Sequence, residues 1–331
     1  MIRYIIRRIL LMIPILLGVI IVVFTINFCS ESSPAVTILG ATATPEKVAQ
    51  VEHELGLDRP YLEQLGSYLY NLVVKRDLGN SYVYKTPVAK LIAARLPSTV
   101  KVGLMGVVLS VIIGIPLGVL AAVKQYSVLD YGATFLSVIL SAVPSFWLAL
   151  MLITIFSVNL HWLPVSGVGT WKHYVLPVIS VAIGPIAMIT RMTRSSMLEV
   201  IRQDYIRTAR AKGLSEGNVI IHHVLQNGLI PVATIVGMMI GISMTGAIIV
   251  ETIFNIPGLG TLMNSSISSK DYITVQGCVL ICAFIVTTMN LLTDIAYAFI
   301  DPRIKAQYAA AGASRKRESK KEEKTKGGSA A

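Results

Sequence analysis

The sequence predicts an all-α membrane protein with six transmembrane helices. Of its 331 residues, 54% are hydrophobic and only 14% are charged, which is too apolar for a soluble domain of this size. Six long runs are uncharged or carry a single charge, and about 20 such residues span a hydrocarbon core roughly 30 Å thick. The runs cover residues 9–30, 102–123, 131–160, 174–190, 228–250 and 272–300.

The N-terminal segment, residues 1–30, is predicted to be a short cytoplasmic start followed by the first span. The opening MIRYIIRR is basic, as in a signal peptide. The apolar run that follows is too long for a signal peptide, and no small-x-small cleavage site comes after it. We therefore expect an uncleaved span with its N-terminus inside.

Residues 31–97 change to a soluble character and predict an external helical insertion between the first and second spans. Thr44-Pro45-Glu46 combines a capping residue, a proline at the first helical position and an acid near the positive end of the helix dipole. That helix is expected to end at Gly56, and a second is expected over Tyr61 to Leu72. Thr86-Pro87 is expected to open a third helix.

Residues 98–305 are predicted to form the membrane-spanning core with the other five spans, the second of which contains Pro144. With six crossings, most Lys and Arg residues of the short loops fall on one side, which indicates that both termini are cytoplasmic. The net charge of +11 reflects this bias, and we expect no nucleic-acid partner. Gly114-x-x-x-Gly118 and Gly237-x-x-x-Gly241 allow close helix approach, either inside the chain or against a partner.

The one large polar interruption of the core is the stretch from Glu199 to Pro231, which we call the bracket, with its loop at about 199–228. It is predicted to be a helix, a tight turn and a second helix. The first helix repeats one face at Ile201, Tyr205 and Ala209. Gly213 is expected to close this helix in a left-handed conformation, and Ser215 to cap the next one. Taken alone, this pattern also fits an ordinary loop with positive-inside charge.

The run DYIRTARAKGL, followed by HHVLQNGLIP, resembles the cytoplasmic loop of ABC importer permeases of the dipeptide, oligopeptide and nickel type. The general permease pattern is E-A-A-x-x-x-G. Arg207, Thr208 and Ala209 occupy its first three positions, and Gly213 its glycine. Gln226 stands where the general pattern has proline. The sequence RTARAKGL is similar to the corresponding segment of the peptide-transporting members of this family.

Two further phrases extend the resemblance to about residue 305. The segment ETIFNIPGLG, which begins at Glu251, resembles the phrase that follows the fifth span in this family. Its Pro257, Gly258 and Gly260 predict a tight re-entrant turn. Asp301-Pro302-Arg303 ends the last span as in the family. Residues 306–331, rich in Lys and Arg among glutamates, are predicted to be a disordered cytoplasmic tail.

The resemblance implies that the bracket between the fourth and fifth spans is a coupling helix that docks on a separate ATPase. Its expected docking residues are Asp204, Tyr205, Arg207, Thr208, Ala209, Arg210, Gly213 and Leu214. The implied partners are a second permease, two ATPase subunits, an external substrate-binding protein and membrane lipid. The implied location is the bacterial inner membrane, as a multi-pass protein.

The chain is not expected to be an enzyme or to hold a metal or cofactor of its own. The sequence contains no G-x-x-x-x-G-K-[ST] phosphate loop, so ATP and Mg²⁺ are expected on the partner ATPases. The resemblance implies peptide cargo, with nickel complexes or glutathione as alternatives carried by the same kind of machinery.

Glu251 and Asp294 are the candidate pathway residues. A charge at the centre of a bilayer costs about 2.5–3.5 kcal/mol on insertion scales and demands a partner or water. Both residues lie near the ends of their spans, where snorkelling or local salt bridging is the favoured explanation. Facing a cavity, they would meet the charged ends of a substrate. In a different class of protein, a proton-coupled secondary transporter, they would relay protons.

Overall fold

The computed structural model describes residues 2–30, 33–40 and 43–300, and within these ranges its only regular elements are helices. The helices are α1 (Ile2–Phe28), α2 (Pro34–Leu39), α3 (Pro45–Leu55), α4 (Tyr61–Val73), α5 (Val88–Val123), α6 (Val128–Ala142), α7 (Ser145–Leu152), the π-helix η1 (Ile153–Asn159), α8 (Lys172–Ile201), α9 (Asp204–Ala211), α10 (Glu216–Asn218), the π-helix η2 (Val219–Leu225), α11 (Gln226–Ile253), α12 (Leu259–Ser268) and α13 (Tyr272–Ile300). The predicted all-α fold is confirmed. Asp301-Pro302-Arg303 and the expected tail lie outside the described residues.

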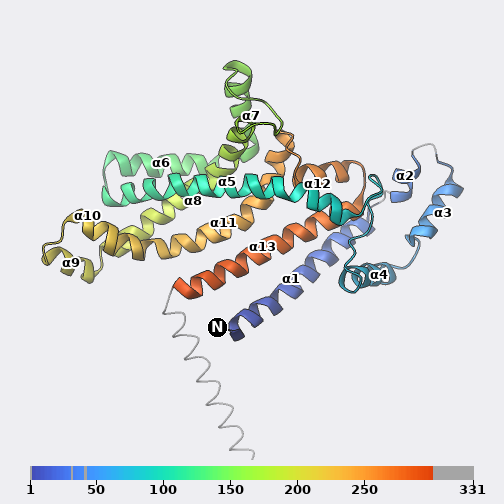
Figure 1. Ribbon diagram of the computed structural model, residues 1–331, viewed down its shortest axis with the longest axis horizontal. Helices are drawn as coiled ribbons and strands as arrows, with labels where there is room; N and C mark the ends of the chain where they lie inside the picture. Colours follow the sequence, from blue (N-terminus) through green and yellow to red (C-terminus); the bar gives the residue numbers. More distant parts are fainter. Residues whose placement is uncertain (1, 31–32, 41–42, 301–331) are drawn as a thin grey trace, which may run out of the picture.

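Five helices in the described part of the chain are long and apolar enough to cross a membrane: α1, α5, α8, the continuous α10–η2–α11 helix and α13. The expected single span over 131–160 is instead broken into α6 and the α7–η1 pair, which meet at 99°. Pro144 lacks a backbone donor and disfavours helical geometry in the residue before it, and Val143 is extended, with φ −77° and ψ 121°. Counting the bent pair as one span gives six. The α7–η1 arm projects from the side of the bundle (Figure 1), while Ala149 of α7 is buried at its base against α8 and α11.

The longest helix, α5, joins two segments that the sequence analysis placed in different regions. The third insertion helix and the second span form one helix of 36 residues, about 54 Å long at 1.5 Å per residue. The expected boundary between residues 97 and 98 falls inside it. Figure 1 shows α5 running between the end of the molecule that carries α2–α4 and the end that carries α9 and α10. We call these the insertion end and the bracket end.

The small-residue motifs pack helices together within the chain. A Cβ added at Gly118 of α5 would lie 2.5 Å from the Cβ of Thr193 on α8, and one at Gly114 would meet Ile189 at 2.9 Å. A Cβ at Gly237 of α11 would lie 2.3 Å from Thr293 Oγ1 on α13. Both glycine pairs therefore serve close helix approach inside this subunit.

The insertion starts with α2, a short helix that was not predicted, and its second helix, α3, starts where the sequence predicts. Thr44 occupies the N-cap position of α3, Pro45 its first turn, and Gly56 ends the helix in a left-handed conformation at φ +68°. The aromatic side chains of α4 reach α1, where the Phe24 and Tyr61 rings are 5.6 Å apart. The insertion is therefore attached to the first span as well as to α5.

Candidate functional site

The bracket lies between α8 and α11, and its backbone differs from the expected helix–turn–helix at both ends. The helix α8, which carries the fourth predicted span, stops at Ile201, and α9 starts afresh after Gln203, which is extended at φ −71° and ψ 148°. Gly213 has φ +82°, which confirms the predicted left-handed turn. Ser215 holds the N-cap position of α10, but its side chain makes no capping bond. The second helix runs through η2 into α11 without interruption.

The bracket has its own apolar core. Ile206 and Ala209 of α9 are buried against Met197 of α8 and against Val219 and Val224 of η2. The face predicted from Ile201, Tyr205 and Ala209 is wrong, because the break after Ile201 resets the helical phase and leaves Tyr205 46% exposed. Ala209, an expected docking residue, is therefore enclosed by its own chain.

The other seven expected docking residues are exposed, and we call them the bracket surface: Asp204, Tyr205, Arg207, Thr208, Arg210, Gly213 and Leu214. The apolar side chain of Leu214 is 41% exposed at the tip, beside Gly213. Arg210 binds Glu216 across the turn with two hydrogen bonds of 2.6 and 3.0 Å, and this raises the pKa of the guanidinium. This exposed ion pair bridges the turn and occupies one bracket arginine.

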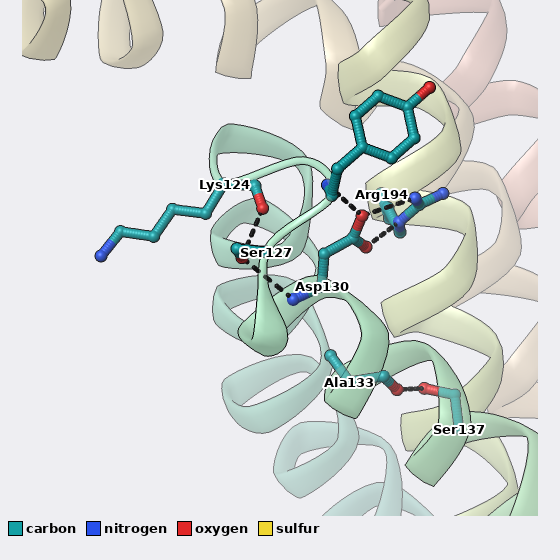
Figure 2. A network of polar contacts seen from close by, with 7 residues as sticks. Lys124, Ser127, Asp130, Ala133, Ser137 and Arg194 are labelled. Carbon is teal, nitrogen blue, oxygen red and sulfur yellow. Dashed lines mark hydrogen bonds and ion pairs between the residues drawn. The ribbon is translucent and has the colours of Figure 1, made fainter.

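An ion pair with a buried carboxylate, which was not predicted from the sequence, lies beside the bracket end (Figure 2). Asp130, in the first turn of α6, is only 1% exposed. Arg194 of α8 donates from Nε to Asp130 Oδ1 and from Nη2 to Oδ2, the latter over 2.8 Å. The backbone N–H of Tyr126 donates to the same Oδ2 over 3.0 Å. Ser127 caps α6 through the Asp130 N–H and donates its hydroxyl proton to the Lys124 carbonyl over 2.6 Å.

A second arginine of α8 holds the other end of α6. Arg191 Nη1 donates to the Ser137 carbonyl over 3.0 Å and lies 3.1 Å from Ser141 Oγ. Arg191 and Arg194 are three residues apart and share a helix face. In the sequence, such arginines indicate only on which side of the membrane a span ends. Their spacing was the available signal, but the partners are 50 to 64 residues away in the sequence.

The structure does not bring the two pathway candidates together. Glu251 is fully buried at the insertion end of α11, where the Gly260 N–H donates to its Oε2 over 2.6 Å. A Cβ at Gly258 would lie 2.3 Å from the Glu251 carboxyl carbon, so the glycines of the IPGLG turn make room for this side chain. Asp294, near the other end of α13, forms a 2.8 Å ion pair with Arg8 of α1. Each residue therefore has a local contact.

Solved structures share this helical arrangement. The methionine ABC transporter MetNI, in inward-facing conformations, matches 64% of this chain and 96% of its own chain with a TM-score of 0.55 and 17% identity. An amino acid ABC transporter crystallised with histidines matches 65% of this chain and 94% of its own, with a TM-score of 0.51 and 15% identity. The fold is that of the membrane-spanning subunit of an ABC transporter.

Sequence relationships name the family. The family described as "Binding-protein-dependent transport system inner membrane component" matches residues 114–306, and its N-terminal counterpart matches residues 1–103. The chain belongs to this family of inner-membrane transport components. It is 41% identical to the dipeptide transport system permease protein DppB of Alkalihalophilus pseudofirmus, over 92% of this chain and 100% of that protein. It is 44% identical to the oligopeptide transport system permease protein AppB of Bacillus subtilis, over 92% and 99% of the two chains.

Proposed function

We propose that this chain is a permease subunit of an ATP-driven importer and forms half of the translocation pathway for peptides delivered by an external binding protein. The names of its dipeptide and oligopeptide relatives support this cargo. In this arrangement the insertion end is external, and the bracket end and both termini are cytoplasmic. The distribution of Lys and Arg over the short loops supports that orientation in the bacterial inner membrane.

The observation that carries the proposal is the bracket. It has a buried core of its own, a stable turn, and an exposed surface at one end of the helices, so it has the form of a docking element. Tyr205 and Leu214 would supply the apolar anchors, and Arg207 would pair with acidic groups on an ATPase. Two ATPases and a second, similar permease would complete the assembly. ATP and Mg²⁺ would bind to the ATPases, and this chain would be non-catalytic.

The bracket is attached so that its movement would reach two spans at once. Met197 of α8 lies in the bracket core, and Ser196 Oγ donates to the Gly228 carbonyl of α11 over 2.7 Å. The α10–η2–α11 helix is continuous. When ATP draws the ATPases together, the two brackets would approach each other and the spans would open the cavity outward. Hydrolysis would then reset the inward-facing state.

Two alternatives are a different cargo for the same kind of importer and a different class of transporter. Nickel complexes or glutathione would use the same machinery with a different binding protein. A proton-coupled secondary transporter would need a relay, and its two candidate acids, Glu251 and Asp294, lie toward opposite ends of the molecule in separate local contacts. This separation favours the ATP-driven importer.

The experiment that tests the proposal is mass spectrometry of the assembly that co-purifies with this chain in mild detergent. The importer predicts two ATPase subunits and one further permease, with hydrolysis that rises when the peptide-loaded binding protein is added. A chain that purifies alone and moves peptide down a proton gradient would contradict it.

A further inference from the structure

The helix α6 is fastened to α8 at both of its ends. At its start, buried Asp130 receives two hydrogen bonds from Arg194. At its far end, Arg191 binds Ser137 and Ser141. Ser141 is three residues before Pro144, where the span breaks by 99°. These polar contacts therefore hold α6 on α8 up to the break, and beyond it α7 packs on α8 through apolar side chains such as Ala149.

The same part of α8 is fastened to the bracket. Ser196 and Met197, two and three residues beyond Arg194, hold α11 and the bracket core respectively. One turn of α8 thus carries contacts to α6 on one side and to the bracket on the other. Figure 2 shows the Asp130–Arg194 pair between α6 and α8, next to the α5–α6 turn.

The chemistry of the pair suits a permanent link. A paired guanidinium and carboxylate with two parallel hydrogen bonds has a fixed geometry as well as charge attraction. Separating the two groups would leave the Asp130 carboxylate buried without its counter-charge, which is strongly unfavourable. The contact is thus suited to transmit a displacement without breaking.

We propose that Asp130, Arg191 and Arg194 form a clamp that makes α6 and the end of α8 move as one rigid body, so that a displacement of the bracket reaches the break at Pro144. These are positioning residues for transport. The inference rests on the proposed function for the source of the displacement. It adds a polar route by which bracket movement reaches the break before the α7–η1 segment, beside the apolar packing of α7 on α8 and α11.

The first test compares transport with ATP hydrolysis in the complete assembly reconstituted in proteoliposomes. The variant Asp130→Asn with Arg194→Gln removes the pair without leaving an unpaired charge. We expect the peptide transported per ATP hydrolysed to fall about tenfold, within the usual range of coupling between sites. The matched control is Arg59→Gln with Glu63→Gln, an exposed ion pair of 3.0 Å in the insertion, and it is expected to keep the wild-type ratio. A wild-type ratio in the first variant would overturn the clamp.

Restoring the pair in reversed order is the next arm. Asp130→Arg with Arg194→Asp is expected to recover part of the transport ratio, because the two charges again compensate each other, although an arginine at position 130 cannot accept the Tyr126 N–H. Recovery would show that transport depends on the ion pair and not on either side chain at its own position. Failure of this variant to transport, while it inserts and binds the ATPases normally, would count against the clamp.

A distance measurement between spin labels tests the clamp independently, because it needs neither the double variant nor an ATPase. Spin labels at exposed Leu136 on α6 and exposed Ile221 on η2 report their separation in the full chain, on a background without native cysteines. The clamp predicts a single narrow distance distribution that broadens in Arg191→Gln. An equally narrow distribution in that variant would overturn the clamp. A wild-type assembly without nucleotide-dependent transport would instead overturn the proposed function.

Discussion

Ser81 and Asp271 are 190 residues apart in the sequence, yet the Ser81 hydroxyl donates to Asp271 Oδ2 over 2.5 Å in the interior of the protein. The same carboxylate accepts the Tyr82 N–H over 3.1 Å and the Thr274 hydroxyl over 2.7 Å. Asp271 immediately precedes α13, so one acid both starts the last span and holds the loop that leads into α5. It fixes the insertion to the bundle.

Replacing this acid with alanine is expected to destabilise the protein. Asp271→Ala leaves three donors without their acceptor, and we expect a loss of about 3 kcal/mol, in the range for buried polar groups that lose a charged partner. Thermal unfolding in detergent measures the change, with Lys270→Gln as an exposed neighbouring control. An unchanged melting temperature for Asp271→Ala would contradict this role.

The bracket surface is expected to determine ATPase affinity. Truncating Tyr205 and Leu214 together to alanine removes both exposed apolar anchors while leaving the bracket core intact, so affinity should fall about tenfold or more with stability unchanged. Titration of the ATPase by surface plasmon resonance measures the affinity. Exposed Ile221→Ala is the control outside the bracket surface, and an equal loss there would show that the surface is wrongly assigned.

Gly213 is expected to be needed for its backbone geometry. No atom lies within 4 Å of a Cβ added there, but its φ of +82° costs an alanine about 1 kcal/mol and excludes proline. Gly213→Pro should therefore abolish transport-linked hydrolysis while the chain still inserts. Gly217→Ala, at a helical position that is also open, should retain it. Normal coupled hydrolysis in Gly213→Pro would refute the assignment of the turn.

Glu251 lies outside the IPGLG turn and accepts the Gly260 N–H. Replacing Glu251 conservatively is expected to be tolerated better than replacing a glycine of the turn. A Cβ at Gly260 would lie 2.4 Å from the Cα of Ile248, so Gly260→Ala must move backbone and should cost about 3 kcal/mol.

Glu251→Gln keeps an acceptor for the Gly260 N–H, and Asp294→Asn keeps the shape of its side chain. We expect both conservative variants to retain peptide uptake. A selective loss of uptake in either would restore that residue as a pathway candidate.

What the sequence could predict was local. Runs of apolar residues located the spans, Thr44-Pro45 located the start of α3, and Gly213 located the bracket turn, because each signal depends on neighbouring residues. The break at Pro144 was harder, since proline is compatible with a kinked span as well as with a separate helix. The restart of α9 after Gln203 carried no glycine or proline signal, so the face containing Tyr205 was wrongly assigned.

The missed contacts were those between distant segments. In the sequence, Asp130 lies just before one apolar run and Arg194 just after another, and neither position indicates a partner. Only the packing of α6 on α8 brings the two side chains together. Ala209 illustrates the same limit at the bracket, because its burial depends on η2 and α8. A pattern within one helix shows which residues share a face, but it does not show what covers that face.

The most direct test of the central claim is photo-crosslinking from the tip of the bracket. A photoreactive amino acid at Leu214, in cells that express the whole transport system, should join this chain to an ATPase subunit identified by mass spectrometry. The same group at exposed Leu62 of the insertion should not. An ATPase adduct from Leu214 alone is the predicted result. Adducts to lipid alone, or ATPase adducts from Leu62 and not from Leu214, would contradict the account.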